Sequence, residues 1–428
     1  MKNLWHPFTQ MKDQSFPEVL SAKGLNLYLK DGKVLKDMIS SWWVILHGHC
    51  EESISEAIAM QAKQLEQVIF ANFSHLPAKE LTSLLQEFLP EELNSFFFSD
   101  NGSTAVEVAL KMAYQYHLNI GNHDKKEFIA FEGAYHGDTI GAMSVGSRSM
   151  FSKPFNPLLF DVKRVSFPST FENDPDRKQK EKNSIQHVEK LLSTHQIAAL
   201  IIEPLIQGAA GMRICSIEYL QTLSKLCKKY DTIVIYDEVM TGFGRTGELF
   251  SFIKAKTVPD IVCVSKGITG GFIPLGLTIA SETIYKGFLS DDPLKAFYHG
   301  HSYTANPIAC QAAIASLKLL KEKPLYKEIE SWHRKYIQML SSLPFIKNIR
   351  VVGTMMAFDI FAEDEGYLST IGKRLQKNLY EKGIYIRPLG NTIYLLPPYC
   401  IKKEELEEVY TRLKESMESI FSSKSFKN

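Results

Sequence analysis

The sequence places an amine, a carboxylate and a small-residue turn at the ends of apolar segments. Lys266 follows the apolar run of residues 261–264 and precedes a glycine-rich turn. Asp237 closes a second apolar run, and a turn with Gly102 and Ser103 joins a third run to a helical pattern. Ligands of open α/β sheets bind at the carboxyl ends of parallel strands. We therefore expect the Lys266 amine and the Asp237 carboxylate to lie side by side at such an edge.

Each of these features also has a structural explanation. A lysine at a strand end usually extends into solvent, and Asp237 and Lys266 could form an ion pair with no catalytic role. Gly102 and Ser103 offer free N–H groups at the positive end of a helix dipole, which suits a phosphate, although an N-cap without a ligand is the commoner case. An ion pair alone would not require a phosphate-binding turn as well. The combination suits pyridoxal phosphate, with the amine holding the cofactor and the carboxylate keeping its pyridine nitrogen protonated.

Two loops combine aromatic and polar side chains. Tyr135 and His136 stand between glycines after the apolar run of residues 127–131, an arrangement that suits either a planar ligand or a plain surface turn. Residues 297–307 form a second such loop, which opens onto a helical pattern.

Two further features concern the substrate. The adjacent Trp42 and Trp43 either pack in a core and an interface or form the wall of a substrate pocket, and the sequence favours neither reading. Arg387 precedes a proline within an apolar strand pattern at residues 384–396. Its guanidinium either binds a substrate carboxylate in bidentate fashion or is a solvated residue at a sheet edge.

Strand and helix patterns alternate through the middle of the sequence. Strand patterns lie at residues 95–98, 127–131, 197–202, 232–237 and 261–264, and helical patterns at 53–90, 105–113, 219–230 and 308–320. This alternation predicts an α/β fold with a mostly parallel sheet covered by helices on both faces. Residues 172–183 are charged without apolar periodicity and predict a solvated loop.

The C-terminal region has a different, mixed order of elements. Strand patterns at residues 349–361 and 384–396 and helical patterns at 370–381 and 403–422 predict a smaller α+β domain. We expect a large cofactor-binding domain over residues 51–310 and a small domain formed by residues 1–50 together with 311–428.

Composition narrows the class of partner. The formal net charge is +1 and no basic block is present, which argues against nucleic acid and anionic membranes and favours small ligands. The six cysteines are scattered without a CxxC pair, so we expect neither a disulfide framework nor a metal site. No apolar run approaches the roughly 18 residues that span a bilayer, and no signal-peptide pattern opens the sequence. We therefore expect a soluble cytoplasmic protein.

Several motifs together resemble one enzyme family, the class III, fold-type I pyridoxal-phosphate aminotransferases. The resemblance runs nearly end to end. It rests on residues 5–10 (WHPFTQ), 40–43 (SSWW), 133–138 (GAYHGD), 202–204 (IEP), 237–238 (DE), 241–245 (TGFGR), 265–267 (SKG) and 386–388 (IRP). It implies a large domain with a mostly parallel sheet, a smaller α+β domain, and transfer of amino groups by way of bound pyridoxal 5'-phosphate.

The resemblance also implies roles for individual residues. Lys266, Asp237 and Tyr135 are the implied catalytic residues: Lys266 holds the cofactor and moves a proton between donor and cofactor, Asp237 pairs with the pyridinium, and Tyr135 stacks on the ring. The implied cofactor-binding residues are Gly102, Ser103, Tyr135, Asp237, Val239, Lys266, His301 and Ser302. The implied substrate-binding residues are Phe8, Trp42, Trp43, Tyr135, Gly300, Arg387 and Tyr399. Ser302, beside His301, is implied to reach the phosphate from a second subunit, which implies a homodimer with active sites at its interface.

Within the family, the motif at residues 5–10 and the paired tryptophans resemble the members of biotin biosynthesis, which aminate 8-amino-7-oxononanoate to 7,8-diaminononanoate. The implied amino donor is S-adenosylmethionine. Phe8 stands where many members with that donor have tyrosine, and residues 299–306 resemble lysine-using relatives, so lysine is an alternative donor. Another class III enzyme, such as an ω-amino-acid aminotransferase or an aminomutase, and a non-catalytic binding protein on the same scaffold are the further alternatives.

Overall fold

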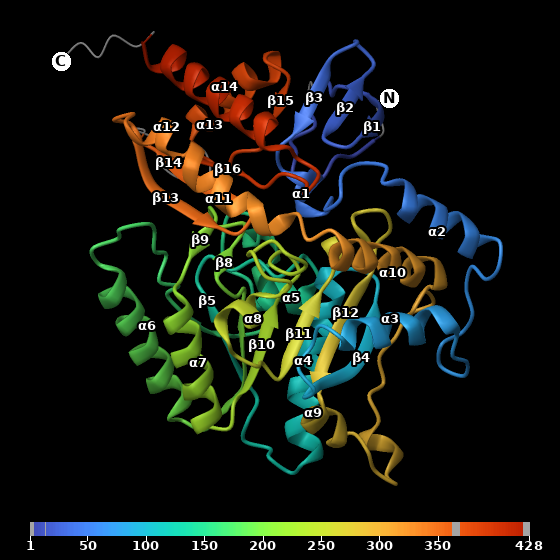
Figure 1. Ribbon diagram of the computed structural model, residues 1–428. Coiled ribbons are helices and arrows are strands. Elements are labelled where there is room, and N and C mark those ends of the chain that lie inside the picture. The colour runs from blue at the N-terminus through green and yellow to red at the C-terminus, as the bar shows by residue number, and fades with distance from the viewer. Residues whose placement is uncertain (1–3, 13, 362–368, 423–428) are drawn as a thin grey trace.

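A seven-stranded sheet forms the centre of the computed structural model, which describes residues 4–12, 14–361 and 369–422 (Figure 1). Its strand order is β4-β12-β11-β10-β7-β5-β6. The strands are β4 (Leu93–Ser99), β5 (Glu127–Phe131), β6 (Lys163–Val165), β7 (Ile197–Ile202), β10 (Ile233–Asp237), β11 (Ile261–Val264) and β12 (Gly276–Ser281). β10 runs parallel to β7 and β11, and β5 runs parallel to β6 and β7, whereas β12 is antiparallel to both of its neighbours. The predicted mostly parallel sheet is confirmed.

The side chains of the central strands alternate between two hydrophobic cores. In β10, Val234 and Tyr236 belong to one core, and Ile233 and Ile235 belong to the other. A strand that buries both faces needs helices on both sides of the sheet. The helix α4 (Gly102–Asn119) packs against β11 and β12 on one side, and α3 (Leu76–Gln86), α7 (Ile217–Lys229) and α10 (Pro307–Glu322) contribute to the core on the other.

Short elements connect these helices and strands. They are α1 (Ser40–Trp43), α2 (Glu52–Ala62), α5 (Ile140–Val145), η1 (Lys153–Leu158), α6 (Arg177–Leu192), β8 (Ile206–Gln207), β9 (Arg213–Ile214), α8 (Ser251–Ala255), η2 (Lys266–Thr269), α9 (Glu282–Lys286) and η3 (Pro293–Lys295). None of the helices in the described ranges combines the length and the apolar composition needed to cross a membrane.

The N-terminal and C-terminal segments build two smaller sheets together. One has the order β1 (Val19–Lys23), β2 (Asn26–Leu29), β3 (Val34–Asp37), β15 (Ile384–Tyr385), and the other β13 (Ile346–Val352), β14 (Met355–Ile360), β16 (Thr392–Leu395). The accompanying helices are α11 (Tyr326–Tyr336), α12 (Gln338–Ser341), α13 (Thr370–Glu381) and α14 (Lys403–Ser422). β3 and β15 pair in parallel, so segments more than 300 residues apart share one sheet.

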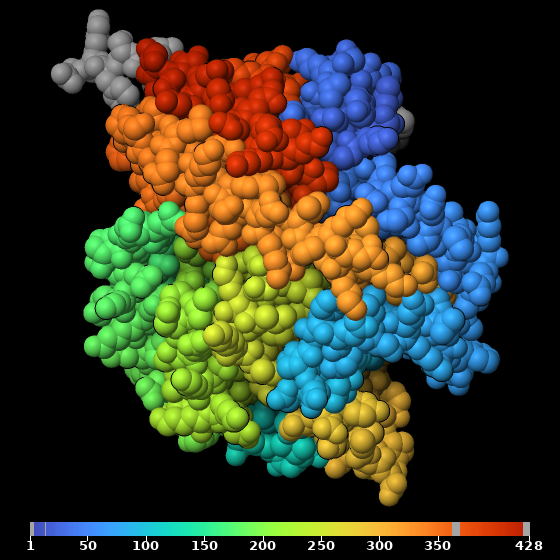
Figure 2. Space-filling view, viewed as in Figure 1, coloured from blue at the N-terminus to red at the C-terminus, as the bar shows by residue number. Residues whose placement is uncertain are grey.

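The space-filling view shows the first strands and the last helix adjoining each other on top of the larger sheet-containing part (Figure 2). This arrangement supports a division into residues 51–310 and residues 1–50 with 311–428, whose boundaries stay a prediction. Residues 1–3, 13, 362–368 and 423–428 of those ranges lie outside the described residues.

Two predicted elements differ from the structure. Residues 172–183 are not wholly a loop, because α6 begins at Arg177; its buried positions Val188 and Leu192 lie in its second half, so the exposed first half shows no apolar period. The strand predicted over residues 384–396 is interrupted between β15 and β16. Pro388, which has no N–H for a ladder bond, lies within the interruption.

Candidate active site

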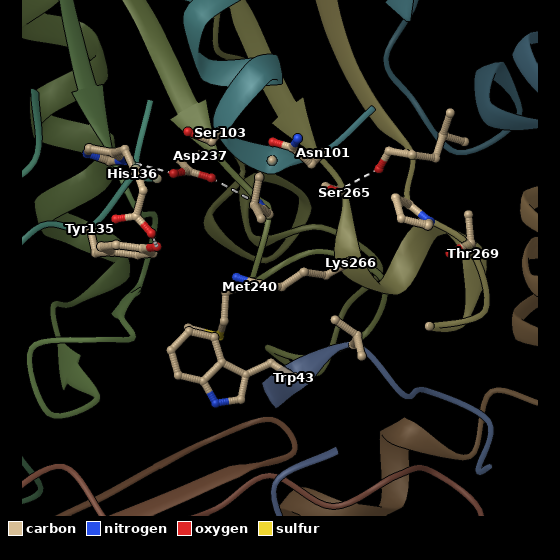
Figure 3. Close-up of a pocket in the computed structure, with 18 of the residues that line it drawn as sticks. Trp43, Asn101, Ser103, Tyr135, His136, Asp237, Met240, Ser265, Lys266 and Thr269 are labelled. Atoms are coloured by element: carbon tan, nitrogen blue, oxygen red, sulfur yellow. Dashed lines mark hydrogen bonds and ion pairs between the residues drawn. The ribbon is translucent and has the colours of Figure 1, made fainter. Parts of the chain in front are cut away.

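A cavity of about 630 Å³ lies at the carboxyl edge of the central sheet (Figure 3). Residues from strand ends, from the start of α4, from the loop after β5 and from the N-terminal segment line it. Of the residues singled out in the sequence, the cavity brings together Trp43, Gly102, Ser103, Tyr135, Asp237, Val239 and Lys266. The amine, the carboxylate and the small-residue turn therefore lie in one cavity, as expected.

Lys266 follows β11 and opens the short helix η2. Its backbone has a φ of 44°, a left-handed value that is unusual for a residue with a side chain. The Nζ atom lies 4.8 Å from the ring centroid of Trp43. Burial lowers the pKa of the amine, against the opposing effect of the nearby Asp237 and Glu203 carboxylates. A lowered pKa increases the neutral, nucleophilic fraction of the amine near neutral pH.

Asp237 ends β10 on the neighbouring strand, where it is directly opposite Cys263 in the ladder. The Nδ1 atom of His136 lies 2.7 Å from Asp237 Oδ2, and the N–H of Val239 donates to Oδ1 at 3.1 Å. These two contacts fix the orientation of the carboxylate. His136 Nε2 is buried and has no hydrogen-bond partner among the described residues.

Glu203 is a second buried acid at the cavity and directly follows β7. Its carboxylate accepts the N–H of Tyr135 at 3.0 Å and the N–H of Gly208 at 2.9 Å. Burial raises the pKa of Glu203 to about 7 in spite of these hydrogen bonds. The sequence assigned no site role to Glu203, and it offered His136 only as part of a loop that suits a planar ligand. The signals for them were Glu203-Pro204 after an apolar strand, in the same position as Asp237, and the histidine beside Tyr135.

The start of α4 faces the cavity through small residues. Asn101, not Ser103, is the N-cap: its side chain accepts the N–H of Thr104 at 3.0 Å, and the Thr104 hydroxyl accepts the N–H of Asn101 at 3.2 Å. The first N–H groups of a helix have no intrahelical carbonyl partner. The N–H groups at Gly102 and Ser103 are therefore available to an anion, with the positive end of an 18-residue helix behind them.

Two glycines make room at this turn. A Cβ on Gly102 would lie 2.6 Å from Val239 Cγ1. A Cβ on Gly137, whose φ is +131°, would lie 2.1 Å from the hydroxyl of Ser103. That hydroxyl is hydrogen-bonded to the Thr139 side chain at 2.8 Å and accepts the Thr139 N–H at 3.0 Å. The helix start and the loop with Tyr135 are thus locked together.

Tyr135 extends along the cavity beside Asp237 (Figure 3). Its hydroxyl donates to Asp138 at 2.9 Å, and burial raises the pKa of the phenol, with the charge of Asp138 adding to the effect. The residue is 38% exposed and lines the cavity, so it is accessible to a ligand.

The opposite wall comes from α1, a strained turn near the N-terminus. Residues 40–43 all have positive φ, between 44° and 75°. Left-handed backbone costs roughly 1–2 kcal/mol per residue for side chains with a Cβ. The two tryptophans of the turn take different places. Trp43 is buried, donates from Nε1 to the Tyr394 hydroxyl at 3.2 Å and lines the cavity, whereas Trp42 is 37% exposed.

Arg387 and Phe8 both contact the Trp42 ring. The Arg387 guanidinium carbon lies 4.5 Å from the ring centroid, and the Phe8 ring stands edge-on at 5.6 Å. In the part of the chain that the structure describes, Arg387 forms no ion pair. It lies in the loop after β15, not in a strand. A partly buried guanidinium without a carboxylate is suited to bidentate binding of one from a ligand.

Arg245 secures the same wall from behind. Its side chain is 1% exposed and donates to the carbonyl oxygens of Pro397 at 3.1 Å, Trp43 at 3.2 Å and Ile45 at 3.0 Å. It thereby ties the loop after β10 to both terminal segments. Its two terminal nitrogens donate to main-chain carbonyls, and Nε is buried without a hydrogen-bond partner among the described residues.

The remaining predicted site residues lie elsewhere. Tyr399 was expected to contact substrate, but it is 3% exposed and its hydroxyl donates to the Phe243 carbonyl at 2.8 Å, which places it in the core behind Arg245. Tyr399 does not line the cavity among the described residues, and its contact with substrate stays a prediction. Tyr394 takes the place beside Trp43. The loop with Gly300, His301 and Ser302 does not line the cavity of its own chain within the described residues.

Comparisons with known proteins identify the family. The family model "Aminotransferase class-III" matches residues 9–417. A relative from Synechococcus elongatus, named adenosylmethionine-8-amino-7-oxononanoate aminotransferase, is 49% identical over 420 residues, which cover 98% of this chain and 99% of the relative. The crystal structure of the protein of that name from Methanocaldococcus jannaschii has a TM-score of 0.90 at 34% identity and covers 97% of each chain.

A second solved structure that resembles the chain contains a bound cofactor. An amine transaminase from an uncultivated Pseudomonas species, in its PLP-bound form, has a TM-score of 0.91 at 28% identity, covering 97% of this chain and 98% of that chain. The cavity fits pyridoxal phosphate on its own chemistry: a pKa-lowered amine suits the aldehyde, a buried carboxylate suits the pyridine nitrogen, and the helix start suits the phosphate. The chain belongs to the class-III aminotransferases and is an enzyme that transfers amino groups with pyridoxal phosphate as its cofactor.

Proposed function

We propose that this aminotransferase carries an amino group from S-adenosylmethionine to 8-amino-7-oxononanoate and so forms the 7,8-diaminononanoate of biotin biosynthesis. The relatives from S. elongatus and M. jannaschii bear the name of this reaction and match over nearly the whole chain. The observation that carries the proposal is the Arg387 guanidinium, held on the Trp42 ring with no ion-pair partner in the described ranges. A keto acid whose apolar chain separates a carboxylate from a carbonyl suits a cation, an aromatic wall and an amine.

Three residues carry the chemistry in this proposal. Lys266 holds the cofactor at its aldehyde carbon and moves the proton that leaves the donor's α-carbon. Its lowered pKa supports both roles, because the amine must be neutral to act as nucleophile and base. Asp237, oriented by His136, keeps the pyridine nitrogen protonated. When bound, the cofactor supplies a ring that takes up the electron pair left on the α-carbon.

Four residues position the cofactor in this proposal. Gly102 and Ser103 bind its phosphate with backbone N–H groups. Tyr135 covers one face of the ring, and Val239 contacts the other. The close approach of Val239 to Gly102 supports this pairing, since a side chain at residue 102 would displace the valine.

We further propose a homodimer in which residues 297–306 of one subunit complete the site of the other. Ser302 is exposed, and Gly300 and His301 do not reach the cavity of their own chain as far as the structure describes it. Exposed apolar side chains such as Trp5 (86%) and Tyr298 (72%) also favour cover by a second copy. The six free thiols fit a reducing compartment, and the cytoplasm is the location we propose.

Lysine is the second candidate for the donor. Phe8, which touches Trp42 edge-on, offers no hydroxyl to the polar end of a donor. An ω-amino-acid aminotransferase is the second candidate for the reaction, supported by the likeness to an amine transaminase at 28% identity.

A half-reaction assay tests both choices. The purified holoenzyme is mixed separately with S-adenosylmethionine and with lysine, and the absorbance of the cofactor is followed. The true donor alone converts the cofactor to its amine form, and 8-amino-7-oxononanoate then restores the original spectrum. Restoration by ω-keto acids but not by 8-amino-7-oxononanoate would overturn the proposed substrate. Failure of the gene to complement a biotin-requiring strain would overturn the proposed role in biotin biosynthesis.

A further inference from the structure

The turn that carries both tryptophans has an unusual backbone. Ser40, Ser41, Trp42 and Trp43 have φ values of 51°, 44°, 68° and 75°. Four successive residues with a Cβ in the left-handed region are strained, and such strain persists only where neighbouring groups hold it. The handedness matters for the site, because this path turns Trp43 toward Lys266 and Trp42 toward Arg387.

Asp37 is the group that holds the beginning of the turn. It ends β3 and is fully buried. Its Oδ1 atom accepts the N–H of Ile39 at 3.1 Å, and its Oδ2 atom accepts the Ser41 hydroxyl at 2.7 Å. His49 Nε2 lies 3.0 Å from the same Oδ2 atom. The Asp37 carboxylate thus restrains Ser41 of the turn and Ile39, the residue before the turn, and is also in contact with His49 in the segment that follows.

The other restraints of the turn do not duplicate this one. The Ser40 hydroxyl donates to the Leu396 carbonyl at 2.6 Å, and Arg245 binds the carbonyl of Trp43. Both contacts fix the position of the turn relative to the C-terminal segment and the loop after β10. The bond from Ser41 to Asp37 is the side-chain contact that closes the turn upon itself.

We propose that Asp37 and Ser41 are positioning residues of this aminotransferase: they hold residues 40–43 in the left-handed turn that places Trp43 against the Lys266 amine and Trp42 beneath Arg387. Neither residue lines the cavity among the described residues, so both act through the tryptophans. The inference rests on the proposed function in one respect: it assumes that the substrate binds against the cavity wall that contains Trp43.

A pair of substitutions at Ser41 separates strain from the loss of a hydroxyl. Ser41→Ala removes the bond to Asp37 and keeps the penalty of a left-handed residue with a Cβ. Ser41→Gly removes the same bond but adopts a positive φ without that penalty. We expect kcat/KM of Ser41→Ala to fall roughly tenfold, as for loss of a hydrogen bond to a charged group, and Ser41→Gly to stay within about threefold of the wild type. Equal losses in the two variants, or no loss in either, would overturn the proposal.

Asp37→Asn provides an independent test with a matched control. Asparagine keeps the shape but removes the negative charge and replaces one acceptor oxygen by an NH2 donor, so the Ile39 N–H and the Ser41 hydroxyl cannot both donate to it as they do to the carboxylate. The control is Asp260→Asn, because Asp260 also accepts a strand N–H, from Val234 at 2.8 Å, but precedes β11 at the opposite edge of the sheet. We expect kcat/KM to fall roughly tenfold in Asp37→Asn and to change less than about twofold in the control. If Asp37→Asn does not fold, the two Ser41 variants decide.

A measurement without cofactor or substrate keeps this inference separate from the proposed function. The background variant carries Trp5→Phe, Trp42→Phe and Trp332→Phe. Trp43 is then the remaining tryptophan of the four in the chain. Acrylamide quenching then reports the burial of Trp43 alone. We expect quenching to increase with Asp37→Asn and Ser41→Ala but not with Asp260→Asn or Ser41→Gly. Unchanged quenching in all four variants would contradict the positioning role even if the enzyme used a different substrate.

Discussion

The two walls of the cavity are built in opposite ways. On the sheet side, Lys266, Asp237 and Glu203 stand at the ends of the adjacent strands β11, β10 and β7. On the N-terminal side, Trp42 and Trp43 stand on a left-handed turn held by the neighbouring Asp37 and by Arg245 from a distant segment. Strand ends thus position the reactive groups, with left-handed backbone at Lys266 alone among the three, whereas four successive left-handed residues position the two tryptophans.

This difference has an energetic basis. The ladder bonds of a parallel sheet fix the strand ends without help from the site residues, so a reactive side chain can be replaced with little change in fold. The turn has no ladder and depends on individual hydrogen bonds, each of which contributes about 1 kcal/mol. Substitutions on the sheet side should therefore change the rate of chemistry, and substitutions on the turn side should change the handling of substrate.

Lys266→Ala should have the largest effect. Without the amine, the cofactor has no covalent attachment and the proton has no carrier, so we expect transamination to fall by at least about 10⁴-fold. Turnover and the cofactor absorbance of the purified protein provide the measurement. Lys254→Ala, which removes a lysine paired with Glu330, should leave both unchanged. A Lys266→Ala protein with the wild-type spectrum would mean that another group holds the cofactor.

Asp237→Asn should have the next largest effect. An amide cannot stabilise a protonated pyridine nitrogen by charge, and loss of such electrostatic stabilisation costs on the order of 10²–10³ in kcat. Single-turnover rates with a donor measure the loss, while Lys266 still retains the cofactor. A rate within about threefold of the wild type would show that the carboxylate plays no part in the chemistry.

Arg387→Leu probes the groups beside the opposite wall, because Arg387 stacks on Trp42 and neither residue lines the cavity among the described residues. Loss of a charged hydrogen-bond donor to a carboxylate should raise KM for the keto acid about 10-fold to 100-fold, with a smaller change in kcat. Steady-state kinetics at varied keto acid concentration give the two constants separately. An unchanged KM with a lowered kcat would mean that Arg387 acts in the chemical step, and the two sides of the cavity would then not differ in role.

The smallest expected effect concerns a buried acid next to Asp237. Burial raises the pKa of Glu238 from 4.5 to about 7. Its contribution to stability is therefore present below pH 4.5 and is lost as the pH rises through about 7. We expect the free energy of unfolding of the cofactor-free protein to decrease over this interval by on the order of 2–3 kcal/mol from this group. Glu238→Gln should flatten the decrease in chemical denaturation curves, and an unchanged slope would contradict the assignment.

The sheet side of the site follows from the sequence, and the turn does not. Apolar runs that end in Lys266 and Asp237 specify strands and their ends, because two-sided burial leaves few alternatives for such segments. Nothing in the Ser-Ser-Trp-Trp sequence signals a left-handed path, since serine and tryptophan disfavour it. The turn is held by the nearby Asp37 together with Arg245 and the Leu396 carbonyl, and only the complete fold brings the last two groups to it.

The positions of single residues could not be predicted for the same reason, because they depend on the complete fold. Tyr394 and Tyr399 are both buried tyrosines close together in the sequence, and only the packing shows that Tyr394 adjoins Trp43 while Tyr399 lies behind Arg245. Glu203 and His136 were visible in the sequence as a strand-end acid and a loop histidine. Their link to Asp237 depends on three strand ends meeting at one edge, which spacing along the chain does not specify.

The most direct test locates the cofactor on the chain. Reduction of the holoenzyme with borohydride fixes the cofactor to the amine that holds it, and peptide mapping by mass spectrometry then identifies that lysine. The structure predicts a single modified peptide that contains Lys266, with Lys111 and Lys254 unmodified. A pyridoxyl group on any other lysine would contradict the assignment of the active site to the carboxyl edge of the sheet.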